Sequence, residues 1–157
     1  IPDELLKKVI QSRSFNQGFD TLEYVAAALL DMEWHSLSAD APLQDIEKFE
    51  QQALAKHGVD VPFVPPRYKS AFFSHSMGGG YSAGYYAYMW SEILAADAFA
   101  YVQEQGGLTR EMGEKYRKEI LEVGNSRDLM ESFKAFRGQE PDTSALLKRR
   151  GLKATVQ

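Results

Sequence analysis

The sequence predicts an all-α fold of about seven helices with no sheet. Apolar residues recur at the three-to-four spacing of helices, helix-capping residues stand before these stripes, and no convincing strand pattern is present. The composition, 44% hydrophobic and 25% charged, is typical of a globular protein. Because 157 residues suffice for one compact core, we predict a single helical domain over residues 1–157.

Three helices are predicted in the N-terminal part. A first short helix occupies residues 2–12 and begins with a proline, which is common at helix starts. A long amphipathic helix, the main core helix, runs from the N-cap candidate Asp20 to about residue 37. A third helix over residues 42–57 ends at Gly58, a residue type that readily adopts the left-handed conformation after a helix.

An extended loop is predicted over residues 59–74. Prolines within it fix φ and lack an amide donor, so they exclude a helix. Long ordered loops of this kind are often functional. A helix from about Tyr81 to Gln105 follows, and two glycines at 106–107 end it.

Three more helices complete the chain. Thr109 caps a helix that runs to about residue 122, and Ser126 caps the next one, which Gly138 closes. A last short helix is predicted to begin at Pro141 and Asp142 and to run through Leu147. Short connections between helices favour an all-α domain.

The segment from Phe73 to Glu92 carries a ladder of tyrosines. Tyr81, Tyr85 and Tyr88 are spaced i, i+4 and i+7, so on a helix their phenols share one face, while the opposite face is apolar and docks on a core. A buried phenol needs a hydrogen-bond partner that a phenylalanine would not. We therefore predict that the tyrosine face binds a ligand, and an ordinary aromatic core stripe is the alternative.

A histidine and a glycine run lie beside the tyrosines, at His75 and at Gly78, Gly79 and Gly80. Consecutive glycines permit positive φ and let a ligand or another backbone approach closely, at an entropic cost. The imidazole and the phenols are neutral donors that suit carbonyl and carboxylate oxygens, and such donors stabilise an oxyanion without cleaving a bond themselves. For His75 alone, a loop histidine with satisfied hydrogen bonds is the alternative.

Other catalytic and metal-binding patterns are absent from the sequence. It has no cysteine, its three histidines stand far apart, and no H-E-x-x-H pair for zinc occurs. Asp31 and His35 lie at i, i+4 and are interpreted as a hydrogen-bonded pair on a helix surface. Residues 74–76, Ser-His-Ser, lack a nucleophile elbow, and Gly80 is followed by Tyr81 rather than by the lysine of a nucleotide-binding loop.

Charge and hydropathy narrow the class of partner. A net charge of -4 argues against nucleic acid, whose binders usually present a basic face. The longest apolar run, residues 25–30, is far shorter than the roughly 20 residues of a bilayer span, so no membrane segment is predicted. The lack of cysteine fits a reducing compartment, and the cytoplasm is the predicted location. One basic cluster is interpreted as a solvated helix end, made up of Lys148, Arg149, Arg150 and Lys153.

Several motifs resemble one family of enzymes. They are Arg67-Tyr68, the run from Phe73 to Glu92, GGLTR at 106–110, GNS at 124–126, FRG at 136–138 and RGL at 150–152. Together they resemble the C-terminal portion of the thimet-oligopeptidase family of zinc metallopeptidases, and within it the peptidyl-dipeptidase group. The likeness covers essentially all 157 residues, and the H-x4-G-Y-x3-Y-Y-x-Y arrangement from His75 to Tyr88 is specific.

The resemblance implies a place in a larger enzyme. The chain would be part of the catalytic lobe of a helical metallopeptidase that releases dipeptides from the C-termini of oligopeptides, with zinc bound by residues outside this chain. By the family pattern, Tyr88 would donate to the oxyanion, Tyr81 would join it or bind substrate, and His75 would contact the substrate backbone. Tyr85 would line the same cleft, and Gly78 to Gly80 would belong to a mobile loop that closes over the peptide.

On this reading the chain is a C-terminal fragment that lacks the zinc ligands and the N-terminal lobe and is inactive alone. Its start at Ile1, without an initiator methionine, fits a piece of a longer protein. Such a fragment would expose apolar surface where the missing lobe packs, and would self-associate through it. The alternative function is a non-catalytic helical module that binds a peptide or a protein.

Overall fold

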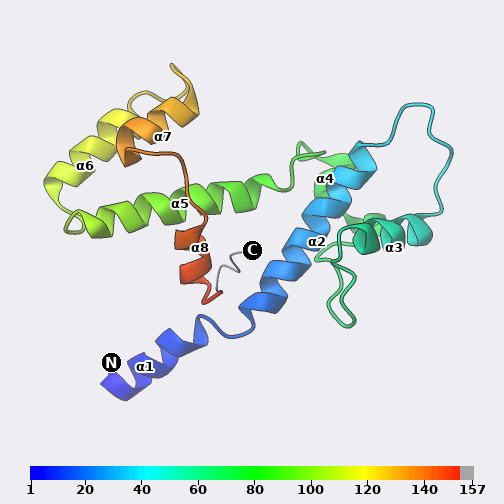
Figure 1. Ribbon diagram of the computed structural model, residues 1–157, viewed down its shortest axis with the longest axis horizontal. Helices are drawn as coiled ribbons and strands as arrows, with labels where there is room; N and C mark the ends of the chain where they lie inside the picture. Colours follow the sequence, from blue (N-terminus) through cyan, green and yellow to red (C-terminus); the bar gives the residue numbers. More distant parts are fainter. Residues whose placement is uncertain (153–157) are drawn as a thin grey trace. The chain divides into compact units, whose positions relative to one another are not determined.

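The computed structural model describes residues 1–152, in which every regular element is helical and no strand is present (Figure 1). The α-helices are α1 (Asp3–Ser12), α2 (Gln17–His35), α3 (Ile46–Lys56), α4 (Ser74–Gly78), α5 (Ala87–Glu104), α6 (Arg110–Tyr116), α7 (Leu129–Arg137) and α8 (Ser144–Arg149). A 3-10 turn, η1 (Ser70–Phe72), precedes α4, and a π-helical segment, η2 (Arg117–Leu121), continues α6. The predicted all-α fold class is confirmed for this part of the chain.

The chain divides into two compact units. The first ends at Tyr88, and the second begins at Met89. The single domain over residues 1–157 stays a prediction.

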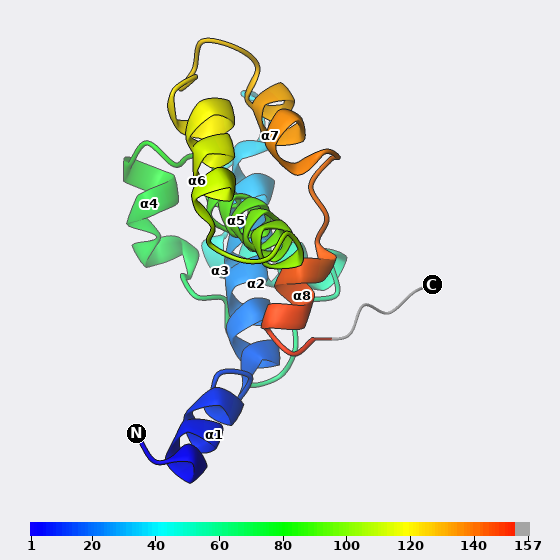
Figure 2. The ribbon, with the colours of Figure 1, turned by 90° about the vertical axis from the view of Figure 1, so that its left-hand side faces the viewer.

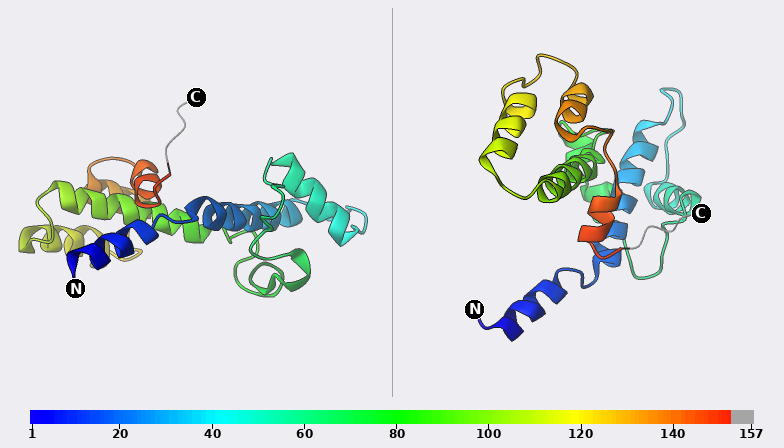
Figure 3. Two further views of the ribbon diagram at one scale, coloured as in Figure 1. Left: turned by 90° about the horizontal axis from the view of Figure 1, so that it is seen from below. Right: turned by 60° about the vertical axis from the view of Figure 1, so that its left-hand side comes forward.

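The core of the first unit is built on α2, against which α3 packs (Figure 3). Ala26 of α2 forms a buried cluster with Leu54 of α3 and with Val59 just beyond it. Alanine is small, so the two helices approach closely at this point. The helix begins at Gln17, before the predicted start, and Asn16 turns the chain into it with a left-handed φ of 54°.

Polar contacts fix the end of α3 to α2. The Glu33 carboxylate accepts hydrogen bonds from Lys56 Nζ at 2.7 Å and from His57 Nε2 at 2.8 Å. The bond with Lys56, and after it the bond with His57, lowers the pKa of Glu33. Gly58 then ends the helix with a φ of +66°, as predicted.

The predicted extended loop over residues 59–74 is irregular in its first part and then forms η1 and the start of α4. The Trp34 indole packs on Phe49 with ring centroids 3.9 Å apart, and its Nε1–H donates to Ser70 Oγ at 2.8 Å. Ser70 donates in turn from its backbone N and its Oγ to Glu50 Oε2, both at 3.0 Å. The loop is therefore joined to both α2 and α3.

The prediction of a helix from Tyr81 is wrong in its first part. Residues 79–86, which we name the tyrosine turn, form a bend and turns, and α5 begins only at Ala87. Ala83 has a φ of 54°, in the left-handed region that a right-handed helix cannot contain. The end of α5 is close to the prediction, since two glycines with φ of 94° and 93° follow it at 106–107.

The second unit has its core among α5, α6, η2 and α7 (Figure 2). Buried side chains from these helices form one cluster, made up of Val102, Met112 and Phe136. Tyr101 and Tyr116 meet Phe136 edge-on, with ring centroids 5.4 Å and 5.3 Å away. Thr109 caps α6 as predicted, because its side chain accepts from the Met112 amide at 3.2 Å.

A buried ion pair ties α5 to α7. Arg137 Nε donates to Asp97 Oδ1 at 2.9 Å, and the Asp142 amide donates to Asp97 Oδ2 at 3.2 Å. Asp97 is only 2% exposed, so its charge depends on these partners for compensation.

Asp128, and not the predicted Ser126, caps α7. The Asp128 side chain accepts from the amides of Met130 and Glu131 at 2.8 Å and 3.0 Å. The left-handed Gly138, with a φ of 89°, closes the helix as predicted. The last helix, α8, begins at Ser144 and therefore later than predicted.

The basic residues at the end of α8 are partly paired. Lys148 and Arg149 lie in the last turn of the helix, and Arg149 and Arg150 both donate to the carboxylate of Glu92. Lys153, the other member of the predicted basic cluster, lies outside the described residues.

α1 differs from the other long helices because none of its residues is buried. It exposes four large apolar side chains, namely Leu5, Leu6, Val9 and Ile10. No helix within residues 1–152 has the length and apolar character needed to cross a membrane.

The position of the α7 cap is testable by substitution. Asp128→Ala should lower the free energy of unfolding by about 1 kcal/mol, because two amides lose their acceptor. Ser126→Ala, three residues before the helix, should leave it nearly unchanged. Chemical denaturation of both variants measures the difference, and an equal loss in Ser126→Ala would contradict the assignment.

Candidate functional site

The structure brings the predicted site residues together within the first unit. His75 and Gly78 belong to α4, and Gly79 and Gly80 follow it. Tyr81 and Tyr85 lie in the tyrosine turn, and Tyr88 lies in the first turn of α5. The site is thus formed by three short consecutive segments rather than by one helix face.

The rings of His75 and the tyrosines form one aromatic cluster. The Tyr81 and Tyr88 rings stack with centroids 5.3 Å apart and planes 17° from parallel. The His75 ring lies 5.6 Å from Tyr81 and 6.2 Å from Tyr88. Tyr85 meets Tyr88 at 5.4 Å and His75 at 5.8 Å, so all four rings touch their neighbours.

Exposure divides the three phenols into two kinds. Tyr81 and Tyr88 are 42% and 44% exposed, whereas Tyr85 is 4% exposed. Tyr81 and Tyr88 are therefore open to a ligand, and Tyr85 belongs to the packed core beneath them. His75 is partly buried, and its ring contacts both the exposed Tyr81 and Tyr88 and the buried Tyr85.

Sequence reasoning missed the aromatic residues that support Tyr85. The Tyr24 ring stacks on Tyr85 at 5.1 Å, and its hydroxyl donates to the Tyr85 carbonyl oxygen at 2.5 Å. Phe73 meets the Tyr85 ring edge-on at 4.9 Å, and Tyr68 lies 5.8 Å from His75. The motifs quoted for the family resemblance include Tyr68 and Phe73 without a role for either, but Tyr24 stands 61 residues from Tyr85 and no local pattern joins them.

The interpretation of Asp31 and His35 as a surface pair is wrong for Asp31, which is 0% exposed. Asp31 Oδ1 accepts from Ser76 Oγ at 2.5 Å and from the Ala83 amide at 3.1 Å, and Oδ2 accepts from the Tyr85 amide at 3.0 Å. His35 Nδ1 lies 3.0 Å from Oδ1. A helix residue far away in the sequence therefore holds the segment that carries the tyrosines.

The pKa values of Tyr85 and Tyr88 are both raised above the ordinary value of a phenol. Burial raises the pKa of Tyr85 to about 12, although the positive charge of Arg67 acts in the opposite direction. A hydrogen bond with Tyr81 raises the pKa of Tyr88 from its ordinary value. Both phenols remain hydrogen-bond donors at neutral pH.

The glycine run is tight at one position only. None of Gly78, Gly79 and Gly80 is among the residues with positive φ, so the expectation of left-handed backbone does not apply to them. A Cβ atom at Gly79 would lie 3.1 Å from the His75 carbonyl oxygen, whereas at Gly78 and Gly80 it would meet nothing within 4 Å. Close backbone approach, the other expectation, occurs at Gly79.

No metal site accompanies the cluster in the described part of the chain. Among residues 1–152, no group of three or more His, Cys, Asp or Glu side chains is placed to hold a metal ion. These residues do not fit the zinc site of the family resemblance, whose ligands were expected outside the chain.

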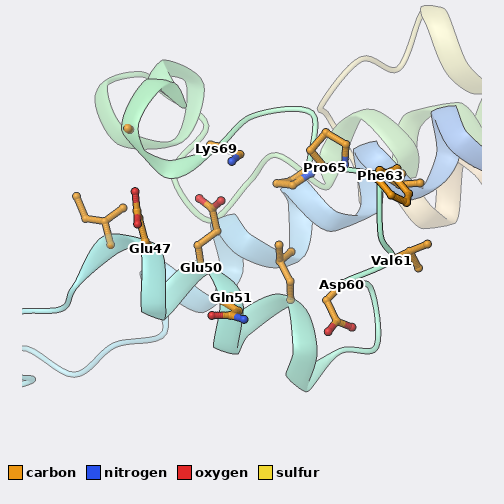
Figure 4. Close-up of a pocket in the computed structure, with 13 residues that line it drawn as sticks. Glu47, Glu50, Gln51, Asp60, Val61, Phe63, Pro65 and Lys69 are labelled. Atoms are coloured by element: carbon orange, nitrogen blue, oxygen red, sulfur yellow. The ribbon is translucent and has the colours of Figure 1, made fainter.

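A separate pocket of about 610 Å³ opens between α3 and residues 60–71 (Figure 4). Its lining carries the carboxylates of Glu47, Glu50 and Asp60, together with Lys69 and the apolar Phe63. Phe63 is 98% exposed, and Glu50 is already occupied with Ser70. None of the residues of the aromatic cluster lines this pocket, and the sequence indicated only the loop of residues 59–74 that forms one side of it.

The crowding at Gly79 predicts an order of stability among three alanine variants. Gly78→Ala and Gly80→Ala should be at least as stable as the parent chain, because alanine restricts the unfolded state by about 0.4–1 kcal/mol. Gly79→Ala should fall below both by about 1 kcal/mol, because its methyl group crowds the His75 carbonyl. Urea denaturation of the three variants measures the order, and equal stability would contradict it.

The buried phenol of Tyr85 predicts a late alkaline titration. Its pKa of about 12 lies above the ordinary value of 10.0, so its contribution to stability is complete below pH 10 and is lost as the pH rises towards 12. Carbon NMR of the phenol rings should show one tyrosine that ionises last, and that signal should be missing in Tyr85→Phe. A last-ionising signal that survives in Tyr85→Phe would refute the assignment.

Comparison with known proteins identifies the family. The chain is 49% identical over 152 residues to the dipeptidyl carboxypeptidase of Salmonella typhimurium and 47% identical over 152 residues to that of Escherichia coli, with 97% of the chain covered in both cases. It is 37% identical to oligopeptidase A of Escherichia coli over 155 residues, or 98% of the chain. The chain spans 22% of the length of each of these relatives.

The family match covers the whole described part of the chain. Residues 1–152 match the family described as Peptidase family M3, and the relatives include dipeptidyl carboxypeptidases, in agreement with the resemblance seen in the sequence motifs. The chain belongs to peptidase family M3.

Proposed function

We propose that this chain is the substrate-binding and transition-state-stabilising part of a zinc-dependent peptidyl-dipeptidase that removes dipeptides from the C-termini of oligopeptides. The observation that carries the proposal is the exposed, stacked pair of Tyr81 and Tyr88 beside His75. The similarity to dipeptidyl carboxypeptidases over 97% of the chain supports the same function.

The chemistry assigned to the phenol pair is donation to a carbonyl oxygen. In a hydrogen-bonded pair of phenols, each hydroxyl has one proton, which can turn from its neighbour to a stronger acceptor such as a developing oxyanion. Tyr88 keeps its proton because its hydrogen bond with Tyr81 raises its pKa. We assign to Tyr88 the donation to the oxyanion that develops on the scissile carbonyl, and to Tyr81 a supporting or substrate-binding role.

His75 and the glycines are assigned to the peptide itself. His75 contacts both exposed phenols by its ring, so a peptide backbone bound at the phenols lies within its reach. The mobile-loop role of Gly78 to Gly80 is supported by the open space around Gly78 and Gly80. Tyr85 is 4% exposed, so its proposed part in substrate binding is to support the rings of His75 and Tyr88, which it contacts.

The metal is proposed to come from the rest of the parent protein. Residues 1–152 offer no group that would hold zinc, so the chain alone is proposed to be inactive. The exposed apolar side chains of α1 support a contact with a missing N-terminal lobe, or self-association when that lobe is absent. The cytoplasm stays the proposed location, which a sequence without cysteine fits.

A non-catalytic peptide-binding module is the second candidate. The 610 Å³ pocket, lined by three carboxylates and apolar side chains, is the observation that favours it. This candidate predicts that the parent protein binds peptides and cleaves none.

Removal of one hydroxyl from the exposed pair tests the proposal in the parent protein. Tyr88→Phe should lower kcat by about 100- to 1000-fold on a peptide substrate, because the transition state loses one donor, while the fold and the metal content stay unchanged. Tyr86→Phe is the matched control, since Tyr86 is 51% exposed and lies outside the aromatic cluster. Unchanged turnover in Tyr88→Phe would remove Tyr88 from the mechanism, and a parent protein without peptidase activity would favour the binding module.

A further inference from the structure

We propose that Asp31 is a positioning residue, whose buried carboxylate holds the tyrosine turn in the conformation that stacks Tyr81 on Tyr88. The inference rests on the proposed function for its effect on turnover. Asp31 itself is 0% exposed and reaches a substrate only through the residues it binds.

The bonds of Asp31 converge on the segment around the site. Ser76, which donates to Oδ1, is the neighbour of His75 in α4. The amides of Ala83 and Tyr85, which donate to Oδ1 and Oδ2, lie two and four residues beyond Tyr81. A single side chain thus holds both sides of the glycine run.

The tyrosine turn depends on these bonds because it has no helical ladder of its own at these points. Ala83 is left-handed, which interrupts the backbone pattern, and its amide and the Tyr85 amide find their acceptors on Asp31. Without the carboxylate, the buried amide of Tyr85 and the partly buried amide of Ala83 would be left without these acceptors. The conformation of the turn is therefore coupled to the presence of Asp31.

The donors require a carboxylate and reject an amide. A carboxylate accepts at about four lone-pair positions, and Ser76, the two amides and His35 approach it as donors. An asparagine has almost the same size, but its NH₂ group would face a donor on whichever side it stands. Asp31→Asn therefore keeps the volume of the core and removes the bonding pattern.

His35 completes the surroundings of the carboxylate. Its Nδ1 lies 3.0 Å from Asp31 Oδ1 and 2.8 Å from the Asp31 carbonyl oxygen, which fixes the ring beside the buried group. The i, i+4 spacing on α2 makes this contact local, whereas the other three bonds reach across 45 to 54 residues. Asp31 therefore joins α2 to the site through these three bonds, and His35 contacts the carboxylate from within the same helix.

The test compares Asp31→Asn with Asp97→Asn in the parent protein. Asp97 is the matched control, because it is also a buried aspartate, 2% exposed, but it bonds to Arg137 and to the Asp142 amide. Asp31→Asn should lower kcat about 100-fold with KM changed less than about threefold, since misplaced groups lose transition-state contacts. It should also speed amide hydrogen exchange at Ala83 and Tyr85 and shift the ring resonances of Tyr81 and Tyr88, and Asp97→Asn should do none of these.

The outcomes separate the two proposals. Exchange and ring resonances need no substrate, so they test Asp31 even in a parent protein that cleaves no peptide. Unchanged exchange and resonances in Asp31→Asn, or the same changes in Asp97→Asn, would overturn the positioning role. If Asp31→Asn does not fold, Ser76→Ala is the second variant, because it removes one bond to Asp31 and leaves both amide bonds. It should lower kcat by about tenfold and shift the ring resonances of Tyr81 and Tyr88. Unaltered kcat and unaltered ring resonances in that variant would also overturn the positioning role.

Discussion

A buried negative charge is the constraint on which the candidate site depends. Asp31 is fully buried in α2, and a charge in that position is tolerated only when donors surround it. Two of these donors are backbone amides of the tyrosine turn, so burial of the charge and folding of the turn depend on each other. The main core helix of the first unit, α2, and the tyrosine turn are therefore held together by these bonds, although they are distant in the sequence.

The aromatic cluster has a buried level and an exposed level with different physical roles. Tyr85 packs among Tyr24, Phe73 and the other rings, and its burial keeps the phenol neutral far into the alkaline range. Tyr81 and Tyr88 lie above it, half exposed and hydrogen-bonded to each other. In the proposed function, the packed rings around Tyr85 support the pair of exposed donors, and donors placed before a ligand arrives are the ones that stabilise charge as it develops.

The parts of the fold that depend on local chemistry were predictable from the sequence. The glycine ends at Gly58 and Gly138 and the cap at Thr109 act within one or two turns, and the structure has all three. The role of Asp31 was not predictable, because its partners lie 45 to 54 residues away and the only local signal was the contact with His35. The chemistry of the residue types led to the candidate site residues, but the burial of each one depends on packing that no periodicity encodes.

The interruption of helical structure in the tyrosine turn explains how the exposed pair forms. On a continuous helix, residues seven apart are separated by about 10.5 Å along the axis, so rings at Tyr81 and Tyr88 would not stack directly. In the structure the two rings stack at 5.3 Å, and the left-handed Ala83 changes the direction of the chain between them. The departure from helical structure is thus the feature that brings the two phenols together. Asp31 accepts a hydrogen bond from the amide of Ala83 itself, which is the physical reason to propose it as a positioning residue for the two tyrosines.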